Sequence, residues 1–168
     1  LGEMETAPWR FWRFWSKRSR YRPSVLDEDL AKLREIYRNK GFLDVSVEQG
    51  GIAIVPRGTG KLDIIVKVEE GKRSFFGKSV LAGNVVLSTP ELLKNSELKQ
   101  GQPYSPALLS EERNRLRKMY GERGYLDARV LSIRTPNLKT QQIDLKFQIS
   151  ENNKFTVNSV LVRGNDKT

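Results

Sequence analysis

The sequence contains neither cysteine nor histidine. Without cysteine, the chain cannot form disulfides, thiolate nucleophiles or zinc–cysteine sites. Without histidine, it lacks the usual general base, the Ser-His-Asp triad and the commonest metal ligand. No apolar run approaches the roughly 20 residues that a membrane-spanning helix needs. These absences disfavour an enzyme and favour a binding or scaffolding protein.

The 168 residues suit one ordinary domain or two small ones. Lysine and arginine number 30 against 20 acidic residues, which gives a net charge of +10, and 38% of the residues are hydrophobic. The chain begins Leu1-Gly2-Glu3, without a methionine, and resembles a segment of a longer protein. The lack of a leader sequence therefore indicates nothing about its compartment.

The chain contains an internal repeat of about 81 to 83 residues. Its first part shares 11 of 27 aligned positions between the two copies. The matching segments are 21–47 with 104–130 at an offset of 83, and 62–68 with 143–149 and 79–84 with 160–165 at an offset of 81. A period of this length is that of a small tandem domain rather than a solenoid.

Each copy predicts one long helix. Apolar residues recur in the spacing of one helical face. They are Leu26, Leu30, Leu33 and Tyr37 in the first copy, and Leu109, Leu116 and Tyr120 in the second. Ser24 or Asp27 is placed to cap the first helix. Gly41 and Gly124 are placed to end the two helices.

Strands flank these helices. Alternating apolar and polar residues predict strands within 43–55, 62–68, 126–133 and 143–149, with a bend at Gly50-Gly51 and turns at 56–60 and 134–138. Another strand is predicted at 78–82. After it, Ser88 and Glu91 have capping-box spacing around Pro90, which predicts a short helix.

These elements predict an α+β fold. In the complete copy they follow the order β-α-α-β-β, with two helices packed on a three-stranded mixed sheet. We expect a unit at 1–71 that lacks its first strand, a complete unit at 72–150, and the first strand of a following unit at 151–168. Because residues 67–76 connect two strands directly, we expect a restricted orientation of the units, with Phe75 or Phe76 at the junction.

Four short motifs occur in a fixed order, and three of them occur twice. Gly-Asn follows the first strand, Gly-x-Pro-Tyr precedes the long helix, Leu-Arg-x-x-Tyr lies within it, and Gly-Phe/Tyr-Leu-Asp follows it. They occur at 83–84 and 164–165, at 101–104, at 33–37 and 116–120, and at 41–44 and 124–127. In this order and spacing, nearly the whole chain resembles the POTRA (polypeptide-transport-associated) family.

The resemblance implies a periplasmic segment of an outer-membrane-anchored protein that assembles or translocates other proteins. Such a segment would bind unfolded outer-membrane proteins in a chaperone-like way and dock accessory assembly lipoproteins. It implies no catalysis and no cofactor. Asp44 and Asp127 lack a second carboxylate at metal-binding spacing, so no metal site is expected either.

In this fold the second strand of each unit lies at a sheet edge. Such an edge can bind an extended peptide through the main chain and so tolerates many client sequences. An edge that is merely solvated is the alternative. The candidate partner-binding residues are Leu43, Val45, Val47, Gln49, Gly50, Gly51, Ile52 and Ile54 in the first unit, and Leu126, Ala128 and Val130 in the second.

The segment 9–22 combines three tryptophans and two phenylalanines with six basic residues and no acid. Its candidate membrane or client contacts are Trp9, Arg10, Trp12, Arg13, Trp15, Lys17 and Arg18. Packing between the helices is the simplest interpretation, and contact with anionic lipid or client is the second. A module that binds anionic membrane or nucleic acid is the alternative function. Nucleic acid is disfavoured because the other basic residues are interleaved with acids.

The missing first strand of the first unit and the strand predicted at 155–163 are complementary. We therefore expect head-to-tail self-association, in which the C-terminal strand of one molecule fills the vacancy in the next. Such a contact does not close on itself, so it produces open chains of molecules.

Overall fold

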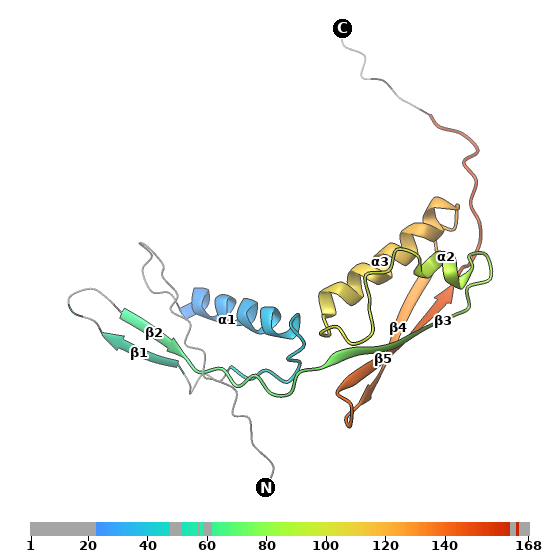
Figure 1. Cartoon of the computed structure of the whole chain (residues 1–168). Helices are drawn as coiled ribbons and strands as arrows, with labels where there is room; N and C mark the ends of the chain where they lie inside the picture. The colour runs from blue at the N-terminus through green and yellow to red at the C-terminus, as the bar shows by residue number, and fades with distance from the viewer. Residues whose placement is uncertain (1–22, 48–51, 57, 59–61, 162–163, 165–168) are drawn as a thin grey trace.

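The computed structural model describes residues 23–47, 52–56, 58, 62–161 and 164. The first unit contains α1 (Pro23–Arg38), β1 (Ile52–Pro56) and β2 (Leu62–Val66). The second unit contains β3 (Phe75–Ala82), α2 (Thr89–Leu93), α3 (Pro106–Glu122), β4 (Arg129–Asn137) and β5 (Gln142–Ser150) (Figure 1). Neither α1 nor any other helix in the described part of the chain has the length and apolar character of a membrane span.

The second unit is built on a sheet of order β3-β5-β4. β3 runs parallel to β5, and β4 runs antiparallel to it. Both helices lie on one side of this sheet (Figure 1). The predicted α+β fold, with two helices on a mixed sheet, is therefore confirmed.

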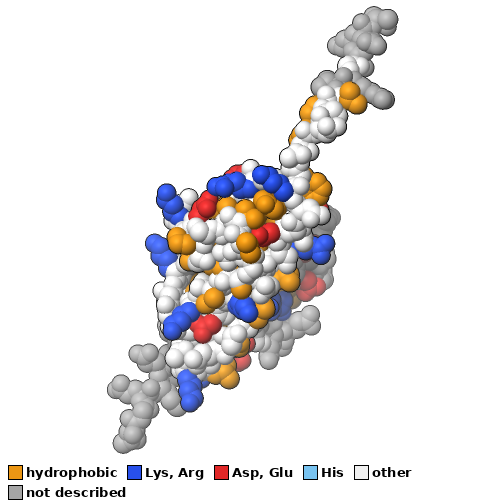
Figure 2. Space-filling model, turned by 90° about the vertical axis from the view of Figure 1, so that its right-hand side faces the viewer, with side chains coloured by type: hydrophobic (Ala, Val, Ile, Leu, Met, Phe, Trp, Pro, Cys, Tyr) orange, Lys and Arg blue, Asp and Glu red, His pale blue; other side chains and the backbone are white. Residues whose placement is uncertain are grey.

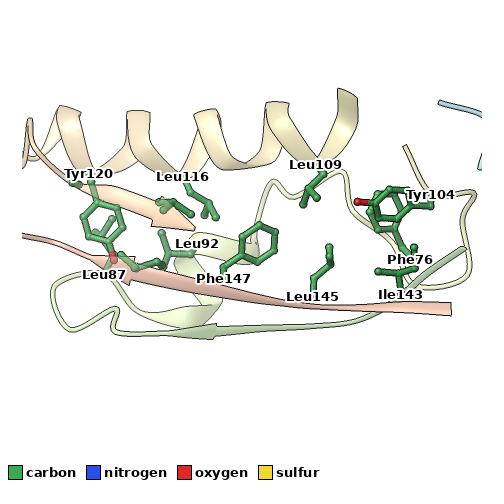
Figure 3. Packing of buried hydrophobic residues seen from close by; sticks show 13 residues of the cluster. Phe76, Leu87, Leu92, Tyr104, Leu109, Leu116, Tyr120, Ile143, Leu145 and Phe147 are labelled. Atoms are coloured by element: carbon green, nitrogen blue, oxygen red, sulfur yellow. The ribbon is translucent and has the colours of Figure 1, made fainter. Parts of the chain in front are cut away.

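The core of the second unit lies between α3 and β5. Leu109, Leu116 and Tyr120 project from the helix toward Leu145 and Phe147 on the strand (Figure 3). The Phe76 and Tyr104 rings pack beside them at a tilt of 38°, with centroids 4.7 Å apart. The predicted helical stripe and the predicted alternation of β5 thus meet in one hydrophobic cluster.

The first unit has a smaller core of its own. Its buried residues are Leu30, Leu33, Tyr37, Val45, Val47 and Val66. β1 pairs with β2 in antiparallel register from Ile52↔Val66 to Pro56↔Leu62, and an isolated bridge joins Ser46 to Glu69. The bend predicted at Gly50-Gly51 lies outside the described residues.

Most predicted helix ends are confirmed. Ser88 Oγ accepts a hydrogen bond from Glu91 N at the start of α2. Gly41 and Gly124 have φ values of 97° and 90°, which favour glycine after a helix. The cap predicted at Ser24 or Asp27 is wrong, because α1 begins at Pro23 and contains both residues.

One predicted turn is displaced. β4 continues to Asn137, so the turn expected at 134–138 lies instead at 138–141. Asn137 Oδ1 accepts hydrogen bonds from Lys139 N at 3.1 Å and Thr140 N at 3.3 Å. An Asn side chain that binds the backbone two residues on is a common start of a turn. The Pro136 and Asn137 pair therefore ends the strand rather than forming the turn.

The two units meet at a polar joint. Asn39, just after α1, accepts hydrogen bonds at Oδ1 from Ser105 Oγ and Ala107 N, both at 3.0 Å. Ser105 itself caps α3 by accepting from Leu108 N at 3.2 Å. A side chain of the first unit therefore helps to cap a helix of the second, which fixes the distance between the two elements.

Aromatic and main-chain contacts complete this joint. The Arg73 guanidinium lies 5.5 Å from the Phe42 ring centroid and 5.8 Å from that of Phe75, and Arg73 Nε donates to Lys40 O at 2.8 Å. Leu43 packs against the core of the second unit. These contacts support the expectation of a restricted joint with Phe75 at its centre.

Candidate functional site

The candidate site is the free edge of β4. β5 is the central strand of the second unit, so β3 and β4 are the edges of the sheet. All nine residues of β4 pair with β5 on one side, from Arg129↔Ser150 to Asn137↔Gln142. Within the described residues, no strand or loop pairs with the other side. Unpaired strand edges present main-chain donors and acceptors to any extended chain.

The β3 edge is less available. At its start, Phe76 N donates to Gln102 O at 2.9 Å, and Gly101 N donates to Phe76 O at 2.8 Å. At the irregularity between Phe76 and Ser79, Lys78 N donates to Asp144 Oδ1 at 2.7 Å. A loop thus occupies the start of the free edge of β3, whereas the Lys78 contact faces β5, so β4 is the more accessible edge along its whole length.

Side chains on β4 divide between its two faces. Val130 faces the core, whereas Leu131 and Ile133 are 64% and 51% exposed on the opposite face. Exposed apolar residues of this kind can contact alternate side chains of an added strand. Pro136 lacks an N–H, so the part of the edge that can donate hydrogen bonds is 129–135.

Of the partner-binding residues predicted in the second unit, one lies on the surface and two lie in the core. Leu126 is 69% exposed and precedes β4. Ala128 and Val130 are buried in the core. A strand added at this edge would therefore contact their main chain and not their side chains. Leu131 and Ile133 were missed, although their alternation with Val130 places them on the outer face.

The predicted first-unit residues are more dispersed. Val45 and Val47 are buried in the first core, while Leu43 packs against the second. Ile52 and Ile54 lie in β1, where Ile54 is exposed. The remaining candidates lie outside the described residues: Gln49, Gly50, Gly51, Trp9, Arg10, Trp12, Arg13, Trp15, Lys17 and Arg18.

Basic and acidic side chains both lie along β4, with Asp127 just before it and Asp144 in register with Thr135. Arg129 and Arg134 lie exposed on β4, and Lys146 on β5 pairs in register with Ile133. On the face drawn in Figure 2, hydrophobic side chains lie among Lys and Arg side chains. In the described segments, no group of three or more acidic side chains is placed to hold a metal ion.

The motif residues of the second unit stabilise its loops. Gly83 has a φ of 84°, and a Cβ there would lie 2.2 Å from Ile149 O. Asn84 Nδ2 donates to Leu87 O at 3.0 Å and to Thr89 Oγ1 at 3.1 Å. The Gly-Asn motif therefore fixes the turn between β3 and α2 and lines no site.

Glu151 holds the same turn from the end of β5. Its Oε1 accepts hydrogen bonds from Val85 N at 2.8 Å and Val86 N at 2.9 Å. Burial raises the pKa of the Tyr120 phenol above its ordinary value, and the neighbouring Glu151 carboxylate raises it further. The phenol is therefore neutral at physiological pH and acts as a core residue.

A family model of POTRA, described as a surface antigen variable number repeat, matches residues 11–71 and 75–152. The two matches cover most of the sequence, including α1 and both sheets. The chain belongs to the POTRA family. POTRA domains are non-enzymatic scaffold modules, so the prediction that the chain is not an enzyme is confirmed by this membership.

Two curated relatives are outer membrane protein assembly factors. The chain is 26% identical over 173 residues to the outer membrane protein assembly factor BamA of Neisseria meningitidis, covering 100% of this chain and 21% of that protein. It is 23% identical over 158 residues to BamA of Buchnera aphidicola, covering 94% of this chain and 25% of that protein. This POTRA chain thus spans about a fifth to a quarter of the length of these relatives.

Solved structures share the fold. The POTRA3-5 segment of Haemophilus influenzae BamA matches with a TM-score of 0.57 and 20% identity, covering 98% of this chain and 64% of that one. Haemophilus ducreyi BamA lacking POTRA domains 1-3 matches with a TM-score of 0.60 and 19% identity, covering 82% of this chain and 25% of that one. The tandem POTRA architecture of this chain therefore resembles that of both structures.

Proposed function

We propose that this chain is a periplasmic segment of an outer-membrane protein assembly factor and binds extended client polypeptides along the free edge of β4. The assembly role is supported by the similarity to BamA over the whole chain. The binding mode is supported by the unpaired side of β4 in the described sheet. No covalent chemistry is involved in this function.

The free edge of β4 is the observation that carries this proposal. Main-chain hydrogen bonds provide affinity without selecting a sequence, which suits a receptor for many clients. Strands of outer-membrane barrels alternate apolar and polar residues. An added strand of this kind can place its apolar side chains against Leu131 and Ile133, while its alternate side chains point to the side of the sheet that carries the helices. Arg129 and Arg134 would favour clients that carry acidic residues.

Accessory lipoproteins and anionic lipid are the other partners in this proposal. The segment from Trp9 to Arg18 combines aromatic and basic residues, a composition that favours the headgroup region of a membrane. The dependence on salt concentration distinguishes contact with lipid from binding of a client at β4. Lipid attraction weakens strongly with ionic strength, whereas strand addition at β4 persists.

Ile133→Lys is expected to weaken binding of a labelled ten-residue peptide with alternating apolar residues by about tenfold. The substitution replaces an apolar contact beside the edge with a charge, and edge lysines oppose strand addition. Fluorescence anisotropy at high salt measures the affinity. Leu138→Lys is the matched control, because it adds the same charge at a turn residue that is 81% exposed. Equal affinities for the two variants would place the peptide elsewhere.

A further inference from the structure

The long helix of the second unit carries a charge in its hydrophobic stripe. Arg113 lies on α3 between Leu109 and Leu116 of the core stripe. The repeat aligns it with Leu30 of α1, which is buried in the core of the first unit. Within the described residues, the Nε atom of Arg113 is buried and has no hydrogen-bond partner. Buried donors of this kind are normally paired, so this side chain lacks an acceptor.

The other contacts of Arg113 leave its charge unpaired. Its Nη2 donates to Ser110 Oγ at 3.4 Å, which is a long hydrogen bond to a neutral group. In the part of the chain that the structure describes, no carboxylate forms an ion pair with Arg113. The adjacent Glu112 accepts from Arg115 through both of its carboxylate oxygens. Arg113 is therefore a half-buried cation with an unused donor.

Arg113 lies on the β4 side of α3. Arg115 Nη2 donates to Leu92 O, so the flank of α3 that carries Arg115 faces α2. Successive residues of a helix are about 100° apart, which places Arg113 about 160° from Arg115 and therefore away from α2. α2 lies on the β3 side of the sheet, whereas α3 packs against β4 (Figure 1, Figure 3). The flank with Arg113 thus faces toward the free edge of β4.

Arg113 is level with the middle of β4. The leucines before and after it in the stripe project toward Leu145 and Phe147 of β5 (Figure 3). In the β4–β5 register, these two residues pair with Arg134 and Ser132. Directly opposed residues share a face of the sheet, so Arg134 and Ser132 lie on the face that carries the helices. Ser132 is half-buried and Arg134 is exposed. The free edge of β4 therefore passes Arg113 near Ser132.

Alternate residues of β4 direct their main-chain groups to this free edge. Phe75 N donates to Gln141 O at 2.9 Å, so the odd-numbered residues of β5 bond to β3 and the even-numbered ones bond to β4. The β4 residues that pair with even-numbered residues of β5 are odd-numbered. The main-chain groups that remain for an added strand are those of Val130, Ser132 and Arg134. Pro136 has the same phase, where its missing N–H costs no bond within the sheet.

We propose that Arg113 binds an acidic side chain of the client strand that is added at β4. This role of Arg113 depends on the proposed strand addition. A client residue opposite Ser132 directs its side chain to the face that carries the helices, where Arg113 lies. A carboxylate there supplies the missing acceptor in a charge-assisted pair. The preferred client is therefore an extended segment with apolar residues on one face and an Asp or Glu on the other.

Exchange of one client residue tests this subsite. One labelled ten-residue peptide carries a single Glu at the centre of its polar face, and a second version carries Gln there. We expect the parent chain to bind the Glu version about tenfold more tightly, because a charged acceptor strengthens a hydrogen bond to arginine. Arg113→Leu restores the leucine of the first unit and is expected to bind both versions with the weaker affinity. The control Lys118→Leu removes an exposed charge from the same helix and is expected to keep the preference.

These measurements separate the subsite from strand addition. Equal binding of the two peptides by the parent chain would overturn the role of Arg113 and leave strand addition intact. A preference that persists in Arg113→Leu, or that is lost equally in Lys118→Leu, would do the same. Binding of neither peptide would contradict strand addition itself. The comparison of the two peptides on the parent chain requires no variant to fold, and an unchanged melting temperature confirms the fold of both variants.

Amide hydrogen exchange locates the bound peptide on β4. Binding of the Glu version is expected to slow exchange at Val130, Ser132 and Arg134, whose N–H groups face the free edge. Exchange at Leu131 and Ile133 is expected to change little, because their N–H groups already bond to β5. A peptide that binds without slowing exchange at Ser132 lies elsewhere, and this result would overturn the proposed contact with Arg113.

Discussion

Replacing Arg115 by methionine is expected to lower the free energy of unfolding of the second unit by about 3–5 kcal/mol. Arg115 Nη2 and Nε donate to both carboxylate oxygens of Glu112, at 2.6 and 2.9 Å. Nη2 also donates to Leu92 O at 2.5 Å, which ties α2 to α3. Glu112 is only 4% exposed. Methionine would leave this carboxylate buried and without its cation, which is the costly case for a buried ion pair.

The repeat provides a matched control for this substitution. Asp29 and Lys32 occupy the equivalent positions on α1, where their ion pair is 3.6 Å long and largely exposed. Exposed pairs contribute at most about 1 kcal/mol, so Lys32→Met is expected to change stability little. Chemical denaturation of both variants, followed by circular dichroism, compares the two sites. Equal losses would mean that burial of Glu112 does not determine the effect.

Replacing Gly41 by alanine is expected to open the joint between the two units. Gly41 has a φ of 97°, and its added Cβ would lie 2.5 Å from Ser74 O. The left-handed backbone costs a non-glycine residue about 1–2 kcal/mol, and the contact with a carbonyl requires the main chain to move. Gly101→Ala is the matched control, because Gly101 has a similar φ of 85° and no atom within 4 Å of an added Cβ.

Distances between spin labels measure this opening. Labels on cysteines introduced at Lys32 and Lys118 report the separation of α1 and α3, and both side chains are exposed. We expect a narrow distance distribution for the parent chain and for Gly101→Ala, and a broader or shifted one for Gly41→Ala. A broad distribution in the parent chain would contradict the restricted joint.

Local patterns in the sequence were sufficient for much of the fold. The stripe of Leu109, Leu116 and Tyr120 and the alternation of β5 predicted the core because helix and strand periods determine which residues share a face. Gly41 and Gly124 ended their helices as predicted because a left-handed residue follows many helices. Repetition strengthened each of these predictions, since the same pattern occurred twice.

Contacts between units could not be predicted in the same way. Asn39 binds Ser105 and Ala107, which lie 66 and 68 residues away, and no local pattern indicates such a pair. Leu43 was assigned to an edge, although it packs on the next core. Alternation in β4 was ambiguous because apolar residues occur in both phases, so Leu131 and Ile133 were overlooked. Tertiary packing decides each of these cases.

Strand addition at β4 is the central claim, and backbone-methylated peptides test it most directly. Two versions of one client peptide carry N-methyl groups on alternate residues, one along each edge of the extended peptide, with identical side chains. Only one edge of a peptide faces β4, so strand addition requires that one version binds like the parent and the other does not bind. Equal affinity of the two versions would show that side chains, and not the free edge of β4, hold the client.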